Sequence, residues 1–343
     1  MTHSSKRLLT TYRPLLGLAL GVLVTASAFL FVAREWDWRV TWAVLSQSDL
    51  RYLALALCAM LGNIACKTLR WQWLFYPQGQ HFSRRNLLMA LLLGQLGNIL
   101  LPTRLGDLAR IWVLSQGQRI ALSLSLLTVV AEKAMDSVMM LLVLAILLPF
   151  VPLLPWLSKT HLVLAGALII LLVALVWLAV QESLRQRLMR AMRRLRLGPV
   201  ANWAERAMDA IVHLRKLQAW PVQLRLWALS AAIWLLSGLV NHFAFRAVRL
   251  NLPFAAGLLL AVTEISGTNV AYAPAALGVY HSICILTLSL FGVRFAPALS
   301  AALLLYLVVY APIIVGGLLA VWLEGFDLGQ FSKRSSPLEQ KPS

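Results

Sequence analysis

The chain has few charged residues, which excludes an ordinary soluble domain. Only 13% of its residues are charged, whereas soluble domains carry roughly a quarter. Hydrophobic residues make up 60%, and several apolar runs approach or exceed the roughly 20 residues that cross a bilayer. Because lipid cannot satisfy the open edges of strands, the sequence predicts an all-α, polytopic integral membrane protein.

Acidic residues are scarce, and 13 of them stand against 31 lysines and arginines, giving a net charge of +18. In a soluble protein this balance would suggest nucleic acid as a partner. Here the basic residues lie between apolar runs, as they do in cytoplasmic loops of membrane proteins. We therefore expect no nucleic-acid partner, and we expect membrane lipids with anionic headgroups to be the partners.

Cysteine is also rare, and the three cysteines lie inside apolar runs without metal-binding spacing or a disulfide framework. The sequence contains no phosphate-binding loop, no dinucleotide glycine motif and no nucleophile elbow. The sequence therefore predicts no metal site, no cofactor and no catalytic residues, and we expect the chain not to be an enzyme.

Basic residues in the loops predict the topology. Lys6, Arg7 and Arg13 place the N-terminus in the cytoplasm, and the strongly basic segment 181–222 belongs there too. This segment has amphipathic spacing, which favours a helix pair on the membrane surface over a plain solvated loop. Tryptophans near the ends of the apolar runs resemble interfacial belts: Trp36, Trp38, Trp42, Trp71, Trp73, Trp220 and Trp322.

Counting every apolar run as a full span conflicts with the topology that the basic residues predict. If 86–101, 121–148 and 161–180 all cross the membrane, the basic segment 181–222 ends up outside. The conflict disappears if 86–116 is a re-entrant hairpin that enters and leaves on the cytoplasmic side, broken by Pro102 and Gly106. A second hairpin, entering from outside, fits the runs 253–273 and 276–292, which are separated around Pro274.

The two halves then repeat one pattern of span, span, broken hairpin and span, starting on opposite faces. Both breaks read Pro-x-x-Leu-Gly, at Pro102–Gly106 and Pro274–Gly278. Inverted repeats with paired broken helices are typical of transporters. The sequence thus predicts six full spans and two re-entrant hairpins, arranged as a cytoplasmic N-terminus (1–13), a first repeat (14–148), a second repeat (161–323) with the basic insertion 181–222, and a cytoplasmic tail (324–343).

Charges at membrane depth are candidates for function because burying them is costly. At the first break, Arg104, Arg110 and the helix start at Gly106 could bind a phosphate, with Asp107 as a counter-charge. The alternative is an ion pair that only fixes the hairpin. Glu132, Lys133 and Asp136 in the run 121–148, and Glu264 and His281 near the second break, are either charge-coupling residues or structural ones.

These motifs resemble the membrane domain of lysylphosphatidylglycerol synthase/flippase proteins, which also occurs alone. The matching strings are Arg70-Trp71, Leu101–Arg110, Glu132–Asp136 and Pro274–Val279. The chain departs from the family pattern at five positions. Asp107 stands where Glu is usual, Lys133 where Arg is usual, and Ala275, Ala276 and His281 replace two glycines and an acid. The last three changes leave open whether the second break works as in other members.

The resemblance implies binding or translocation of a phospholipid or related anionic lipid across a bacterial-type inner membrane. A soluble domain transfers the aminoacyl group in the two-part proteins, and we expect that domain to be absent here. A separate transferase or glycosyltransferase is then a candidate partner, and a homo-oligomer is compatible with the sequence. The alternative function is a non-transporting scaffold for an enzyme of envelope lipid or glycan synthesis.

Overall fold

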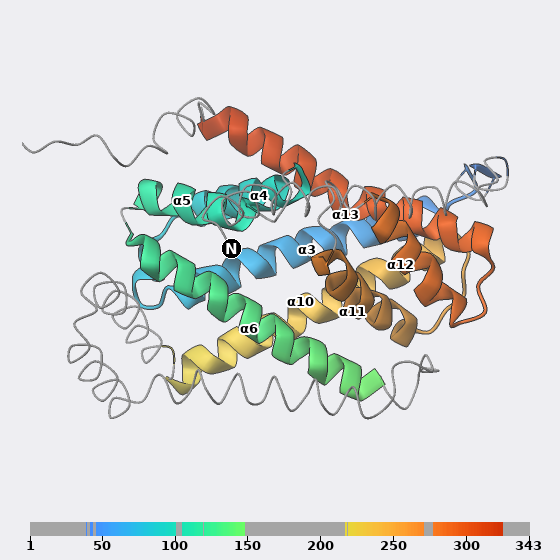
Figure 1. Cartoon of the computed structure of the whole chain (residues 1–343), viewed down its shortest axis with the longest axis horizontal. Coiled ribbons are helices and arrows are strands. Elements are labelled where there is room, and N and C mark those ends of the chain that lie inside the picture. The colour runs from blue at the N-terminus through green and yellow to red at the C-terminus, as the bar shows by residue number, and fades with distance from the viewer. Residues whose placement is uncertain are drawn as a thin grey trace, which may run out of the picture.

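The computed structural model describes residues 46–100, 105–118, 120–147, 219–270 and 277–324, together with Arg39, Trp42, Ala43 and Leu217. Its described elements are helices (Figure 1), and they form two units that follow one another in the sequence. The first unit contains α3 (Leu50–Leu74), the 3-10 helix η1 (Gln78–His81), α4 (Arg84–Leu100), α5 (Gly106–Gln118) and α6 (Leu122–Leu147). The second contains α10 (Trp220–Ala247), α11 (Phe254–Val270), α12 (Leu277–Ser289) and α13 (Phe295–Glu324).

The helix boundaries repeat at a nearly constant separation. Residues 50 and 220, where α3 and α10 begin, are 170 apart, and residues 84 and 254, where α4 and α11 begin, are also 170 apart. The starts of α5 and α12, at 106 and 277, are 171 apart, and those of α6 and α13, at 122 and 295, are 173 apart. The order of one long helix, two short helices and one long helix therefore occurs twice in the chain.

The two units run in opposite directions. The backbone N–H of Asp49, at the start of α3, donates to the carbonyl of Ala247, at the end of α10, over 2.9 Å. Nearer the middle, Asn63 Nδ2 donates to the carbonyl of Ile233 over 2.8 Å. Because α3 and α10 pack antiparallel over their whole length, the second unit is inverted relative to the first, which agrees with the inverted repeat expected from the sequence.

Each pair of short helices forms a hairpin. In the first, Gly97 on α4 lies so close to Gly106 on α5 that an added Cβ would be 2.8 Å from the Gly106 Cα. In the second, the hydroxyls of Thr263 on α11 and Thr287 on α12 are 2.9 Å apart. Since α4 follows the end of α3 and α11 follows the end of α10, the hairpins begin at opposite ends of the long helices (Figure 1).

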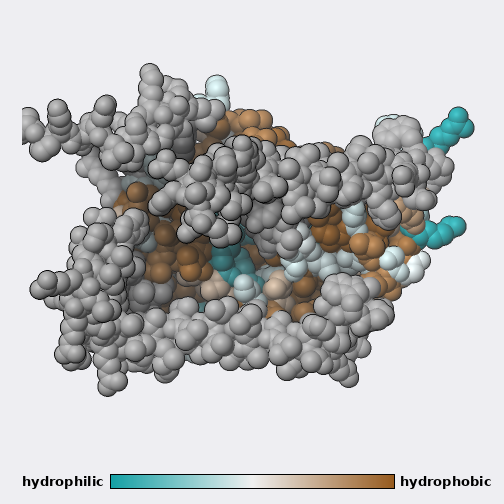
Figure 2. Space-filling model, in the orientation of Figure 1, coloured by the Kyte–Doolittle hydropathy of each residue, from teal (hydrophilic) through white to brown (hydrophobic). Residues whose placement is uncertain are grey.

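The described surface is largely apolar, with a hydrophilic patch near its middle (Figure 2). Three described helices, α3, α10 and α13, are long and apolar enough to span a membrane. Helix α6 has comparable length but carries Glu132, Lys133 and Asp136 in its middle. A polytopic helical membrane protein is the fold class that this arrangement supports.

One sequence-based expectation, the place of Trp71 in an interfacial belt near the end of an apolar run, is wrong. Helix α3 instead continues to Leu74, and Arg70 and Trp71 are 1% and 0% exposed. Both side chains have polar partners on other helices, so the helix can extend past the end of its apolar run. Trp220 and Trp322, in contrast, are each 77% exposed.

Replacing Asn63 by leucine should weaken the contact between the two units. The side-chain amide donates to the Ile233 carbonyl and, over 3.0 Å, to the Ser237 hydroxyl. Hydrogen bonds between membrane helices contribute about 1–2 kcal/mol at most, so we expect a loss of that size in reversible unfolding in mixed micelles. Ala54→Leu, at an exposed position of the same helix, is the control and should leave the unfolding free energy unchanged.

Candidate functional site

Arg110 lies at the centre of a charged cluster between the first hairpin and α6. Its side chain is 3% exposed, and its Nε is 3.3 Å from Asp107 Oδ1, one turn earlier on α5. Its Nη1 is 3.2 Å from Glu132 Oε2 on α6. The guanidinium also lies over the Trp71 ring at 5.0 Å, and Trp71 itself is held by its Nε1 donating to Thr128 Oγ1. Arg110 is therefore fixed by three helices.

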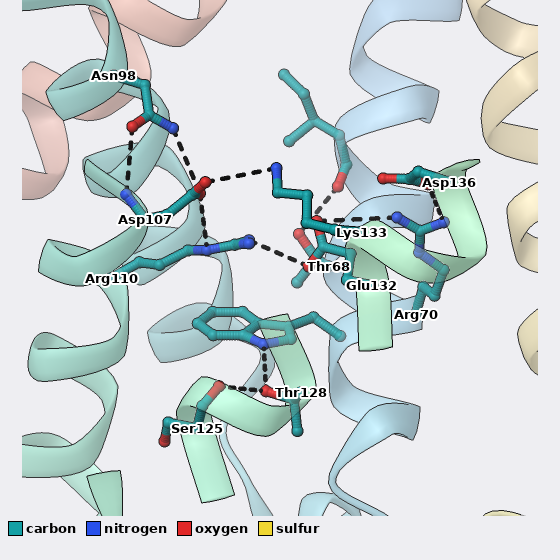
Figure 3. Close-up of polar contacts among 12 residues, drawn as sticks. Thr68, Arg70, Asn98, Asp107, Arg110, Ser125, Thr128, Glu132, Lys133 and Asp136 are labelled. Carbon is teal, nitrogen blue, oxygen red and sulfur yellow. Dashed lines mark hydrogen bonds and ion pairs between the residues drawn. The ribbon is translucent and has the colours of Figure 1, made fainter. Parts of the chain in front are cut away.

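Arg70 occupies the neighbouring position on α3. Its Nη1 is 2.6 Å from Asp136 Oδ1 and donates to Ser230 Oγ over 3.0 Å. Its Nη2 is 3.8 Å from Glu132 Oε1, so the Glu132 carboxylate lies between the two guanidinium groups (Figure 3). Glu132 and Asp136 are four residues apart on α6 and therefore share one face of that helix.

The start of α5 is tied to the cluster by Asn98 on α4. The backbone N–H of Asp107 donates to Asn98 Oδ1 over 3.2 Å, and Asn98 Nδ2 donates back to Asp107 Oδ1 over 3.3 Å (Figure 3). Lys133, which is 49% exposed, reaches Asp107 Oδ2 at 3.4 Å. Asn98 therefore occupies one of the backbone amides in the first turn of α5.

The ion pairs of the cluster join three basic residues to three acidic residues. Arg70, Arg110 and Lys133 stand against Asp107, Glu132 and Asp136. Four guanidinium nitrogens, Nε and Nη2 of both Arg70 and Arg110, are buried without a hydrogen-bond partner in the part of the chain that the structure describes. The cluster thus has spare donors.

Comparison with known protein families identifies the family of this chain. A family model described as "Lysylphosphatidylglycerol synthase TM region" matches residues 18–317. The chain belongs to this family. No curated protein matches the chain. The lysylphosphatidylglycerol synthase TM region is the membrane part of that synthase, and the match spans both units. The chain is therefore a membrane-embedded protein related to lipid modification.

The second hairpin of this lysylphosphatidylglycerol synthase TM region holds a different group of side chains. Cys284 Sγ donates to Glu264 Oε1 over 3.5 Å. His281 is 6% exposed and stacks on the Tyr306 ring at 5.3 Å, with Tyr280 edge-on at 5.7 Å. Gly278 is buried in the first turn of α12. His281 therefore lies among aromatic rings and Glu264 beside the Cys284 thiol, whereas the ion pairs of the described residues gather at the first hairpin.

The structure brings together Asp107, Arg110, Glu132, Lys133 and Asp136, all of which the sequence predicts as site residues. Pro102, Arg104 and Pro274 lie outside the described residues, as do the predicted first spans of both repeats and most of segment 181–222, up to residue 216. Sequence reasoning missed Arg70 and Asn98 as members of the cluster. The one available signal for Arg70 was its place in the family motif, and no signal marked Asn98.

Proposed function

We propose that the chain binds the phosphate of an anionic phospholipid at the Arg110 cluster and allows the headgroup to cross the inner membrane. The observation that carries this proposal is the buried Arg110 guanidinium, which lies at a hairpin and has an unused donor at Nη2. Arginine binds phosphate through charge-assisted hydrogen bonds. Membership in a family related to lipid modification supports a lipid as the source of that phosphate.

The inverted units supply a structural basis for movement. The hairpins begin at opposite ends of α3 and α10, so each is placed to open toward a different leaflet if both are re-entrant. In transporters built from inverted repeats, alternating access comes from the rocking of one repeat against the other around a central site. We place the N- and C-termini in the cytoplasm, in agreement with the positive charge around them.

Other residues have supporting roles in this proposal. Arg104, which lies in the sequence between α4 and α5, would add a second arginine for the phosphate. Asp107, Glu132 and Asp136 hold the guanidinium groups when no lipid is bound. Glu264 and His281 are the candidates for charge coupling from the second hairpin. A phosphate that enters the cluster would compete with Glu132 for Arg110, which links lipid binding to the contact between α5 and α6.

Replacing Arg110 by alanine should abolish lipid movement. The test is the transbilayer rate of labelled phosphatidylglycerol in vesicles that contain the purified chain. We expect the rate to fall at least about tenfold, which corresponds to roughly 1.4 kcal/mol. Arg110→Lys should retain part of the rate because it keeps the charge but loses the bidentate geometry. Arg246→Ala, at an exposed arginine on α10, is the control.

Loss of folding must be separated from loss of function in this experiment. Arg110→Ala leaves the Glu132 carboxylate with only its longer contact to Arg70. The double variant Arg110→Ala/Glu132→Gln also removes the charge of that carboxylate, so that its fold is not destabilised by a buried charge with a weak partner. If the folded double variant moves lipid at the wild-type rate, Arg110 has no part in transport. If the wild-type chain moves lipid no faster than protein-free vesicles do, the scaffold function is favoured instead.

A further inference from the structure

A groove of about 450 Å³ lies between α3, α4 and α13. Leu61 and Thr68 contribute from α3, Leu92 from α4, and Pro312 and Gly316 from α13. Its volume falls within the range of roughly 300–1,000 Å³ that is typical of sites for small molecules. The groove is separate from the Arg110 cluster. Thr68 lines the groove, whereas Arg70, two residues further along α3, points toward α6.

The walls of the groove suit a hydrocarbon chain. Apart from Arg84 and Arg85, its lining is apolar except for Thr68, whose hydroxyl already donates to the Ile64 carbonyl over 2.9 Å. A polar ligand would therefore find no free partner along the walls. Leu61, at the inner end, is 57% exposed. Gly316 permits α13 to approach α4 closely, because an added Cβ would lie 2.9 Å from Leu92 Cδ1.

The two arginines give the groove a charged end. Arg84 and Arg85 begin α4, both are exposed, and neither forms an ion pair with an acidic side chain among the described residues. From Arg84 to Leu92 the helix rises roughly 12 Å, which is close to half of the roughly 30 Å hydrocarbon core. The groove is therefore about one leaflet deep, with its positive charge at one end.

We propose that this groove is a lateral binding site for one anionic phospholipid, distinct from the Arg110 cluster. The lipid would place an acyl chain against Leu61, Leu92 and Gly316 and its phosphate between Arg84 and Arg85. An anionic phospholipid suits both parts of the groove. A free phosphate would leave the apolar walls without a partner, and an uncharged lipid would leave the arginines without an anionic partner. The site would hold a lipid of the same leaflet beside the first hairpin.

The test uses the full chain in phosphatidylcholine vesicles that contain a trace of phosphatidylglycerol with a photoreactive acyl chain. After illumination, we expect cross-links to peptides containing 61–69 and 312–316. Arg84→Ala/Arg85→Ala should lower this cross-linking about tenfold, and so should Ala65→Phe, which fills the groove from an exposed position of α3. Arg51→Ala/Arg246→Ala and Ala54→Phe are matched controls at exposed positions outside the groove, and both should cross-link like the wild type.

Several results would overturn the proposal. Unchanged cross-linking in either groove variant is one, and equal labelling by a photoreactive phosphatidylcholine is another. Complete competition by inorganic phosphate would show an anion site rather than a lipid site. Arg110→Ala should leave the groove cross-links intact even if it stops transport, so this site and the proposed function can fail separately. Groove cross-links that vanish with Arg110→Ala alone would assign them to the cluster instead.

Discussion

Replacing Gly106 by alanine should destabilise the protein by about 3 kcal/mol, although alanine is normally the better helix former. A Cβ at this position would run into the Gly94 carbonyl oxygen and the Asn98 backbone nitrogen on α4. These are backbone atoms of a packed helix and cannot rotate away. The hairpin must therefore open, which would also break the bonds between Asn98 and Asp107.

Gly62→Ala is the matched control for this change. A Cβ on Gly62 would meet only the flexible Leu236 side chain, at 3.6 Å, so we expect an unfolding free energy that is unchanged or raised by up to about 1 kcal/mol. The measurement is reversible unfolding in mixed micelles, followed by circular dichroism. If the two variants unfold alike, α4 and α5 are not packed as tightly as the structure shows.

Replacing Arg70 by methionine should cost about 3–5 kcal/mol, as expected when one partner of a buried ion pair is removed. Asp136 would lose its 2.6 Å partner, and Ser230 would lose a donor at 3.0 Å. Methionine retains much of the length of the side chain, so the cost reflects charge rather than an empty space. The effect should be larger than for most single substitutions.

Two further variants show whether the cost comes from the stranded carboxylate. Arg70→Met/Asp136→Leu removes both charges and should recover a large part of the lost stability. Lys133→Met removes a cation that is 49% exposed and should cost less than about 1 kcal/mol. An Arg70→Met variant as stable as the wild type, or a double variant less stable than the single one, would contradict the importance of this buried pair.

Much of the fold could be predicted from the chain because hydrophobic length and charge placement determine it directly. The predicted run 86–101 corresponds to α4, 121–148 to α6, and 276–292 to α12. The prolines and glycines between runs marked the breaks. Counting positive charges then required two hairpins rather than two additional spans, and the structure contains two antiparallel helix pairs at those places.

The cluster was only partly predictable because its contacts join distant parts of the chain. Asp107 and Arg110 share a helix turn, so their pairing follows from spacing alone. Arg70 meets Asp136 at a separation of 66 residues and Ser230 at 160, and no local pattern encodes such partners. Only the packing of α3 against α6 and α10 makes a buried arginine stable there.

The most direct test of the account is the sidedness of the loops that flank the hairpins. Four exposed positions, Ser83, Ala121, Asn251 and Arg294, can each be changed to cysteine in a chain whose three native cysteines are alanine. In vesicles of known orientation, an impermeant thiol reagent should reach Ser83→Cys and Ala121→Cys from the cytoplasmic side only. It should reach Asn251→Cys and Arg294→Cys from the opposite side only. Labelling of the first two positions from different sides would mean that α4 and α5 do not form a re-entrant hairpin, and the proposed lipid path would lose its structural basis.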